Sequence, residues 1–379
     1  MNVLVTGAGG FLGRNLGVAL ERRPGVEVSR IDLGDTPEAL DRALDAADAI
    51  VHLAGVNRPP QVEAFAAVNA GFTAEICRAL AARGRKPTFV LASSIHAEQD
   101  SPYGASKRGA EEAVRDYCAA TGARGVVYRL KNVFGKWCRP NYNSVTATFC
   151  HNIARDLPIQ ISDPDNAVDL TYVDDVVAAW LGEVESAGRA PAGGFSFAAP
   201  LPSHRVTLGE LARLLRSFRE SRRTLQVPDV SDPFVRALYA TYLSYLEAGD
   251  FGYPLTIRSD DRGDLAEFVK ASAFGQIFVS RTRPGVTRGN HYHHTKAEKF
   301  LVLNGEAVIR FRHVVSGDAS EYRVDGRQWR VIDIPPGYTH SIENVGAGEL
   351  ITLFWASEVF DAERPDTNAL SVQAKHETP

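Results

Sequence analysis

The chain has 379 residues, of which 44% are hydrophobic and 23% charged, and its formal net charge is −4. This is an ordinary globular composition, and the length suits two or three domains of roughly 150 residues, each with its own core. The sequence has no long run of lysine or arginine, which argues against a dedicated nucleic-acid-binding protein.

The sequence shows no pattern typical of secretion or membrane insertion. A predicted strand begins at Asn2 with no charged leader or apolar segment before it, so we expect no signal peptide. No apolar stretch approaches the roughly 18 residues of a membrane span. The four cysteines lack the Cys-x-x-Cys spacing of a thiolate metal site. We therefore expect a cytoplasmic protein with neither nucleic-acid nor membrane partners.

The first 190 residues alternate short apolar runs with amphipathic helical patterns. Predicted buried strands include residues 3–5, 26–28, 49–53, 89–91 and 126–128, with helical patterns at 65–83 and 103–121. Strands that alternate with helices predict βαβ units. This half is therefore expected to be an α/β Rossmann-type domain with a doubly wound parallel sheet.

A glycine-rich turn follows the first strand and opens a helix. Its glycines permit a tight turn, a close backbone approach to a pyrophosphate, and close packing of helix on strand. The N–H groups at the start of the helix can then bind the phosphates. The segment predicts dinucleotide binding by Gly7, Gly10, Phe11, Leu12 and Gly13.

The residues around the second strand leave the preferred dinucleotide open. Asp32, near the end of that strand, would hold a ribose 2′-hydroxyl and favour NAD. Arg14 and Arg30 would instead pair with the 2′-phosphate of NADP. The two arginines tip the prediction towards NADPH.

Tyr103 and Lys107 are four residues apart and project from one face of a predicted helix. A cationic lysine beside a tyrosine lowers the pKa of the phenol and makes it a usable acid near neutral pH. Ser94 closes a preceding strand, where its hydroxyl can bind a substrate carbonyl. These residues predict redox chemistry at a carbonyl group.

Up to about residue 245, the chain resembles an extended short-chain dehydrogenase/reductase of the sugar-nucleotide type. The matching segments are the glycine-rich turn, His52–Gly55, Ser94, the Tyr103/Lys107 pair and residues 172–176. The resemblance implies that Tyr103 is the catalytic acid/base and that Ser94 orients the carbonyl. Lys107 would hold the nicotinamide ribose. The cofactor contacts implied in this region are Leu53, Ala54, Gly55, Tyr103 and Lys107.

The same resemblance implies that residues 129–135 and the loop 136–144 help to bind a nucleotide-sugar. Asn132, Tyr142 and Asn143 are the candidates, and a purely structural loop is the alternative. Relatives that eliminate water carry an acid/base pair just after the serine strand, and residues 95–100 do not present the usual one. This departure favours simple carbonyl reduction over dehydration.

After about residue 250, short β-rich runs replace the helical patterns. The runs cover residues 276–280, 299–303, 307–312, 329–334 and 350–355. Such spacing predicts an all-β barrel or jelly roll. Glycines and a proline interrupt the pattern at 248–254, so the predicted domains are residues 1–248 and 249–379.

Three histidines and one glutamate in this second half form a metal-site pattern. His291 and His293 are two residues apart on a predicted strand and so share a face. Glu298 begins the next strand, and His340 comes from a later strand across the barrel. Such ligands suit a divalent transition metal, with zinc as the default and iron, manganese or nickel as the alternatives.

Residues 255–360 resemble a cupin. The first cupin motif matches fully, and the second has Trp329 or Arg330 in place of its leading glycine. That departure affects a turn and no ligand; a metal-free sugar-binding cupin is the alternative. A metal that polarises the carbonyl of a 4-keto sugar would promote inversion at the neighbouring carbon, and reduction would then lock the result. One keto group would thus serve both domains.

The domain order and segments such as residues 52–59, 134–144 and 288–294 resemble the CapF family of bifunctional capsular-polysaccharide enzymes, as far as about Asp366. The resemblance implies that a zinc-containing cupin epimerises C3 of UDP-2-acetamido-2,6-dideoxy-β-L-arabino-hex-4-ulose. NADPH-dependent reduction at C4 would then give UDP-2-acetamido-2,6-dideoxy-L-talose, a precursor of UDP-N-acetyl-L-fucosamine. A homodimer is also implied.

The base that moves the C3 proton is left open. His294, Lys296, Lys299 and Tyr338 lie near the ligand motifs, and a ligand histidine displaced from the metal is the alternative. Two other functions compete. One is a single-function nucleotide-sugar epimerase, dehydratase or reductase with a non-catalytic cupin. The other is a redox sensor that binds NADP without turnover, although such sensors commonly lack the active-site tyrosine.

Overall fold

The computed structural model describes residues 1–187 and 193–373 of the chain. The fold divides into two compact units. One contains Met1–Arg216 and Pro233–Glu247, and the other contains Ser217–Asp232 and the chain from Ala248 onward. The fold thus groups residues 217–232 with the second unit, whereas the sequence pattern predicts one boundary after residue 248. Among the described residues, no helix has both the length and the apolar character needed to cross a membrane.

The first unit is built on a six-stranded parallel sheet with the strand order β2-β1-β3-β4-β5-β8. Its strands are β1 (Asn2–Thr6), β2 (Glu27–Ile31), β3 (Ala49–His52), β4 (Thr88–Ser94), β5 (Arg124–Leu130) and β8 (Gly194–Phe197). The order reverses direction at β1, so the carboxyl ends of β1 and β3 flank the crevice where such sheets bind ligands.

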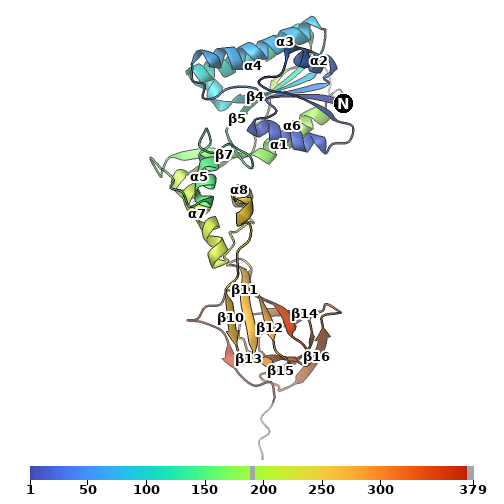
Figure 1. The fold of residues 1–379 in the computed structure, drawn as a ribbon, viewed down its shortest axis with the longest axis vertical. Helices are drawn as coiled ribbons and strands as arrows, with labels where there is room; N and C mark the ends of the chain where they lie inside the picture. Colours follow the sequence, from blue (N-terminus) through green and yellow to red (C-terminus); the bar gives the residue numbers. More distant parts are fainter. Residues whose placement is uncertain (188–192, 374–379) are drawn as a thin grey trace, which may run out of the picture. The chain divides into compact units, whose positions relative to one another are not determined.

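Helices cover both faces of this sheet (Figure 1). One face packs on α1 (Phe11–Glu21) and α6 (Val173–Glu185) through a core that includes Leu16, Leu20 and Trp180. The opposite face packs on α2 (Pro37–Ala46), α3 (Phe72–Ala82) and α4 (Pro102–Thr121). The predicted doubly wound sheet is therefore confirmed. The segment predicted as one helix from residue 65 begins as a π-helix, Phe65–Gly71, before α3.

A smaller three-stranded sheet completes the first unit, in the order β6-β7-β9. Its strands are β6 (Asn132–Phe134), β7 (Ala167–Tyr172) and β9 (His204–Thr207). The helices of this region are α5 (Val145–Ala154), α8 (Pro233–Leu243) and the first part of α7 (Leu208–Thr224), whose residues from Ser217 belong to the second unit. The main sheet and this smaller sheet both contribute residues predicted to bind ligands, Ser94 from β4 and Asn132 from β6.

The second unit contains two antiparallel sheets, in the orders β10-β11-β12-β19-β14-β17 and β16-β15-β18-β13-β20 (Figure 1). The first sheet comprises β10 (Ile257–Asp260), β11 (Gly263–Ala271), β12 (Gly275–Thr282), β14 (Glu298–Asn304), β17 (Val331–Ile334) and β19 (Leu350–Ala356). The second comprises β13 (Thr287–Tyr292), β15 (Glu306–His313), β16 (Ala319–Asp325), β18 (Tyr338–Asn344) and β20 (Asn368–Ala369). Alternate residues of both sheets, such as Phe300 and Ile309, form one shared apolar core.

This architecture confirms the all-β, cupin-like fold expected for the second half. One predicted strand needs correction, because the run at residues 329–334 becomes regular only at Val331. Trp329 is largely exposed there. Trp329 and Arg330, which precede the regular strand, occupy the place where the cupin pattern has its leading glycine.

Candidate active site and metal centre

The glycine-rich turn of the first unit depends on two of its glycines. Gly7 has a φ of +68°, and a Cβ placed on it would lie 2.7 Å from the backbone nitrogen of Ala54. A Cβ on Gly13 would lie 2.4 Å from the carbonyl oxygen of Gly7. Glycine therefore lets α1 and the Leu53–Gly55 loop approach the turn closely.

The start of α1 is suited to an anion. Its N-cap is Gly10, which supplies no capping side chain, and its first turn contains no acidic residue. The backbone N–H groups of Phe11 and Leu12 thus belong to the positive end of the helix dipole, and the first turn of the helix adds no carboxylate to compete for an anion. This arrangement can hold the pyrophosphate of a dinucleotide.

Arg14, Arg30 and Asp32 line a common cavity of about 630 Å³ beside the turn. Asp32 accepts a hydrogen bond from the backbone N–H of Gly9. Arg30 forms an ion pair with Glu21, whose side chain lines the same cavity. The structure thus brings both sets of candidate residues for the adenosine ribose together, and the choice between NAD and NADP stays a prediction.

Tyr103 and Lys107 follow the start of α4, which Ser101 caps by accepting the N–H of Gly104. The Lys107 Nζ lies 5.9 Å from the centroid of the Tyr103 ring and donates to the carbonyl of Ala92 at 3.1 Å. It also lies 3.5 Å from where a Cβ on Gly55 would be. The helix therefore brings the lysine against the loop that the family resemblance assigns to the cofactor.

The pKa of Tyr103 differs from the sequence prediction, which was a lowered value for the phenol beside Lys107. Burial raises the pKa of Tyr103, against an opposing hydrogen bond with Ser94. The lowering of this pKa that the sequence predicts is therefore not found with the protein groups alone, because burial disfavours the charged phenolate. Burial lowers the pKa of Lys107 to about 8, although the carboxylate of Glu111 opposes that shift.

An ionic network centred on the buried Glu111 lies next to this pair and was not predicted from the sequence. Glu111 is 2% exposed, accepts the Ser93 hydroxyl at 2.5 Å, and binds Arg129 through two nitrogens at 2.6 and 3.0 Å. Arg129 also binds Glu98 at 2.7 Å. Glu111 follows Lys107 by four residues, so the helix periodicity could have shown that it shares the face of Tyr103 and Lys107.

The three candidate substrate residues lie on β6 and the loop after it. Asn132, Tyr142 and Asn143 are all exposed. The guanidinium carbon of Arg139 lies 5.2 Å from the centroid of the Tyr142 ring. Their contact with a nucleotide-sugar stays a prediction.

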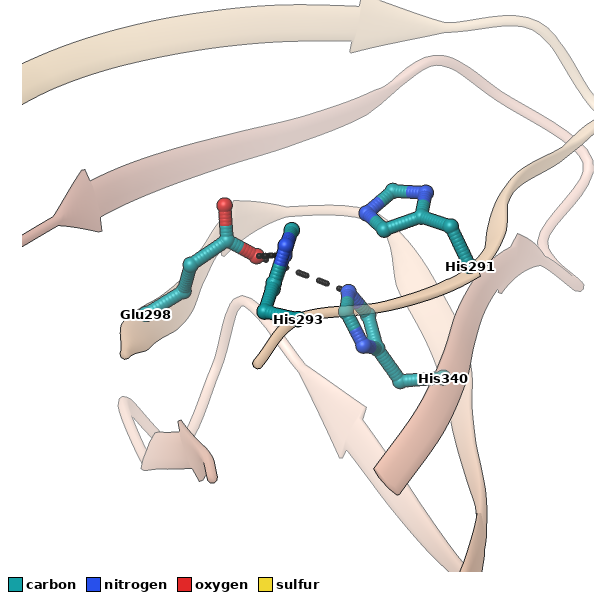
Figure 2. A group of neighbouring side chains, drawn as sticks. All are labelled: His291, His293, Glu298 and His340. Atoms are coloured by element: carbon teal, nitrogen blue, oxygen red, sulfur yellow. Dashed lines mark ion pairs between the residues drawn. The ribbon is translucent and has the colours of Figure 1, made fainter. Parts of the chain in front are cut away.

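The four predicted metal ligands converge in the second unit (Figure 2). Their nearest ligand atoms all lie within 4.8 Å of one another. His291 on β13 is the register partner of His340 on β18, and a register shift beside Gly289 adjusts β13 there. His293 follows the end of β13, and Glu298 begins β14.

The donor atoms of this cluster suit a cation. The Nε2 atoms of His293 and His340 are buried without a hydrogen-bond partner, and they lie 3.3 and 3.5 Å from Oε2 of Glu298. Burial alone would raise the pKa of Glu298, but its histidine neighbours lower it to about 2. Burial lowers the pKa of His291 to about 4, so this imidazole is neutral at pH 7. Three imidazole donors and a carboxylate therefore fit a divalent transition metal.

The four candidates for a base beside these ligands differ in burial and in their partners. The Lys299 ammonium pairs with Asp333 on an exposed face of β14, and the buried Lys296 ammonium binds the carbonyl of Pro365 at 3.0 Å. His294 is exposed. Tyr338 lies two residues before His340 on β18 and so shares the sheet face of that ligand.

Two family models match the two halves of the chain. The NAD dependent epimerase/dehydratase family matches residues 3–191. The Polysaccharide biosynthesis C-terminal domain matches residues 258–368. The fold and the site thus define a Rossmann-type short-chain dehydrogenase/reductase joined to a cupin-like β domain.

Similarity to known proteins extends over nearly the whole chain. The UDP-2-acetamido-2,6-beta-L-arabino-hexul-4-ose reductase of Pseudomonas aeruginosa is 44% identical over 375 residues, which cover 98% of this chain and 99% of that protein. The crystal structure of the capsular polysaccharide assembling protein CapF from Staphylococcus aureus matches with a TM-score of 0.90 and 44% identity, covering 98% of this chain and 100% of the other. The chain belongs to the CapF family.

More distant structures share the fold of the first unit. The UDP-glucuronic acid 4-epimerase of Bacillus cereus in complex with NAD matches 65% of this chain and 96% of its own, with 18% identity and a TM-score of 0.53. At this level of identity the match concerns the fold alone.

Proposed function

We propose that the protein is a bifunctional UDP-sugar enzyme. It epimerises C3 of UDP-2-acetamido-2,6-dideoxy-β-L-arabino-hex-4-ulose at the β domain and then reduces C4 with NADPH at the Rossmann-type domain. The product is UDP-2-acetamido-2,6-dideoxy-L-talose, a precursor of UDP-N-acetyl-L-fucosamine for capsule synthesis. One observation carries this proposal. The chain is similar over its full length to a reductase of this substrate class, and it contains both the Tyr103/Lys107 pair and the buried histidine–glutamate cluster.

For reduction, bound NADPH supplies a hydride to C4. The raised pKa of Tyr103 keeps its phenol protonated near neutral pH, which suits it to donate a proton to the C4 oxygen. The Ser94 hydroxyl orients the same oxygen, and Lys107 holds the nicotinamide ribose. The carbonyl thereby gains one hydride and one proton and becomes a secondary alcohol.

For epimerisation, His291, His293, Glu298 and His340 would hold zinc or another divalent transition metal. Such an ion, when bound, polarises the C4 carbonyl and acidifies the C3 proton. The buried imidazole nitrogens without hydrogen-bond partners support this assignment. The C3 proton must leave one face of the ring and return to the other; Tyr338 is the candidate that shares the sheet face of His340.

The remaining parts of the proposal concern binding and assembly. Asn132, Tyr142 and Asn143 bind the UDP-sugar, and Arg14 and Arg30 bind the 2′-phosphate of NADPH. The protein acts as a homodimer in the cytoplasm, where UDP-sugars and NADPH are both available.

The test is to incubate the full-length protein with the 4-keto UDP-sugar and NADPH in D2O and to analyse the product by mass spectrometry and NMR. A reaction without protein controls for spontaneous exchange. We expect a reduced sugar with one carbon-bound deuterium, located at C3, and one NADPH consumed per product.

The contrary outcomes separate the two activities. A reduced product without deuterium would support the reductase activity but contradict the epimerase activity, and the β domain would then have a binding or assembly role. Exchange at C3 without NADPH oxidation would remove the reductase assignment.

A further inference from the structure

A short segment near the end of the described chain binds the turn between His293 and Glu298, two of the four clustered residues. We call residues 365–367 the C-terminal clasp. The Asp366 carboxylate accepts three consecutive backbone N–H groups, from His294, Thr295 and Lys296, each at 2.9 Å. It also accepts the Thr295 hydroxyl at 3.1 Å. One carboxylate therefore fixes the backbone immediately after His293.

The backbone of the clasp contacts His293 itself. The carbonyl oxygen of Asp366 lies 2.5 Å from Nδ1 of His293. A carbonyl can only accept, so Nδ1 of the ring must carry a proton. A neutral imidazole has one N–H, and its lone pair is then on Nε2, the atom that lies 3.3 Å from Glu298.

The clasp is held from both sides. Before Asp366, the carbonyl of Pro365 accepts the buried Lys296 ammonium at 3.0 Å. After it, β20 pairs with β13, so that Ala369 lies opposite His291. Asp366 has a φ of +38°, which is uncommon for a residue other than glycine. This conformation lets both its carboxylate and its carbonyl face one turn.

We propose that Asp366 is a positioning residue that fixes the tautomer and the orientation of His293 for metal binding. This inference rests on the metal site of the proposed function. Asp366 is not itself a ligand, because its carboxylate is used by the three N–H groups. Contacts of this outer kind typically change metal affinity by about 10- to 100-fold.

The test measures the metal affinity of the full-length protein by competition with a chromogenic zinc chelator. The visible spectrum of the cobalt(II)-loaded protein is recorded beside it. We expect Asp366→Ala to bind zinc about 10- to 100-fold more weakly and to change the cobalt spectrum. Asp366→Gly should behave likewise, since glycine relieves any strain from the positive φ but also lacks the carboxylate. Asp366→Asn keeps one acceptor oxygen and should lose less affinity.

Asp361→Ala is the matched control. Its carboxylate lies in the same part of the chain but accepts the N–H of Glu363 and pairs with Arg364. Within the described chain its carboxylate makes no hydrogen bond to the turn at residues 293–296, so zinc affinity and the cobalt spectrum should stay at wild-type values.

The outcomes distinguish this inference from the metal site on which it rests. If the wild-type protein binds neither ion, the metal site fails and the inference fails with it. If the wild type binds both ions and Asp366→Ala matches its affinity and spectrum, the site stands and the role of Asp366 is overturned. A lower melting temperature with unchanged affinity would also overturn it, because Asp366 would then only stabilise the fold. Should Asp366→Ala not fold, the same comparison on Asp366→Asn decides.

Discussion

The Lys107 ammonium and the Tyr103 ring lie one helical turn apart on α4, with Nζ 5.9 Å from the ring centroid. Burial shifts their pKa values in opposite directions, up for the phenol and down for the ammonium. The phenol is therefore protonated near neutral pH and ready to donate. This relationship makes the pair suited to reduction and leads to the first two predictions.

Replacing Tyr103 by phenylalanine should abolish reduction but leave proton exchange intact. Loss of a general acid typically costs about 10²- to 10⁴-fold in rate, measured here as NADPH oxidation with the 4-keto UDP-sugar. Deuterium exchange in D2O should continue, because the histidine–glutamate cluster is unchanged. Tyr117→Phe is the control on the same helix: it loses a bond to the Arg85 carbonyl but should still reduce. Unchanged reduction in Tyr103→Phe would contradict the assigned role.

Replacing Glu111 by glutamine should shift the pH dependence of reduction. The Glu111 carboxylate raises the pKa of Lys107, which burial lowers to about 8. Without that charge the pKa of Lys107 falls further, so the lysine loses its proton at lower pH. The alkaline limb of the rate profile should therefore move to lower pH.

Glu111→Gln should also reduce stability, because Arg129 keeps its charge but loses its buried partner. Since Arg129 is partly exposed and retains Glu98, we expect a loss of about 1–3 kcal/mol, measured by chemical unfolding. Glu112→Gln, on the exposed side of α4, should change neither property. If Glu111→Gln keeps the wild-type pH profile, Glu111 does not set the pKa of Lys107 during reduction.

Replacing Arg14 by alanine should resolve which dinucleotide is preferred. If Arg14 binds the 2′-phosphate, its loss should raise KM for NADPH by roughly 10- to 100-fold, the effect of one charge-assisted hydrogen bond. KM for NADH should stay nearly constant. Arg22→Ala, at the other end of α1, is the control. If the wild type favours NADH and Arg14→Ala alters neither KM, Asp32 rather than the arginines determines the choice.

Replacing His340 by alanine should have the converse effect of the Tyr103 variant. It removes a ligand from the cluster, so bound metal, measured by elemental analysis, and C3 proton exchange should both be lost. Reduction of a substrate that already has the product configuration at C3 should persist. His294→Ala, an exposed neighbour, should retain the metal. If both His340→Ala and Tyr103→Phe lose both activities while folded, the proposed division of labour is wrong.

The sequence predicted those parts of the molecule that depend on local spacing. The glycines at 7, 10 and 13 indicated the turn, and at Gly7 and Gly13 a Cβ would clash with the backbone that approaches there. Alternation of apolar strands and helices predicted the parallel sheet, and the loss of that alternation predicted the antiparallel unit. The histidine–glutamate cluster was predictable because three of its four residues fall within residues 291–298.

Other features depended on contacts that local patterns do not encode. Strand 329–334 was predicted too long, since β propensity does not report where Trp329 leaves the sheet. The expected pKa of Tyr103 was wrong in direction because its spacing from Lys107 says nothing of burial. Arg129 directly follows the predicted strand 126–128, but only the pairing of β4 with β5 brings it to Glu111.

The sequence by itself thus determined the two fold types, the cofactor turn, the Tyr103/Lys107 pair and the four clustered ligands. Tertiary structure alone decided which residues support them. Asp366 lies 73 residues from His293, in a stretch without helical or strand periodicity, and reads in the sequence as an ordinary turn residue. Its role arises only when β20 pairs with β13, because hydrogen bonds between distant segments depend on the path of the chain rather than on spacing along it.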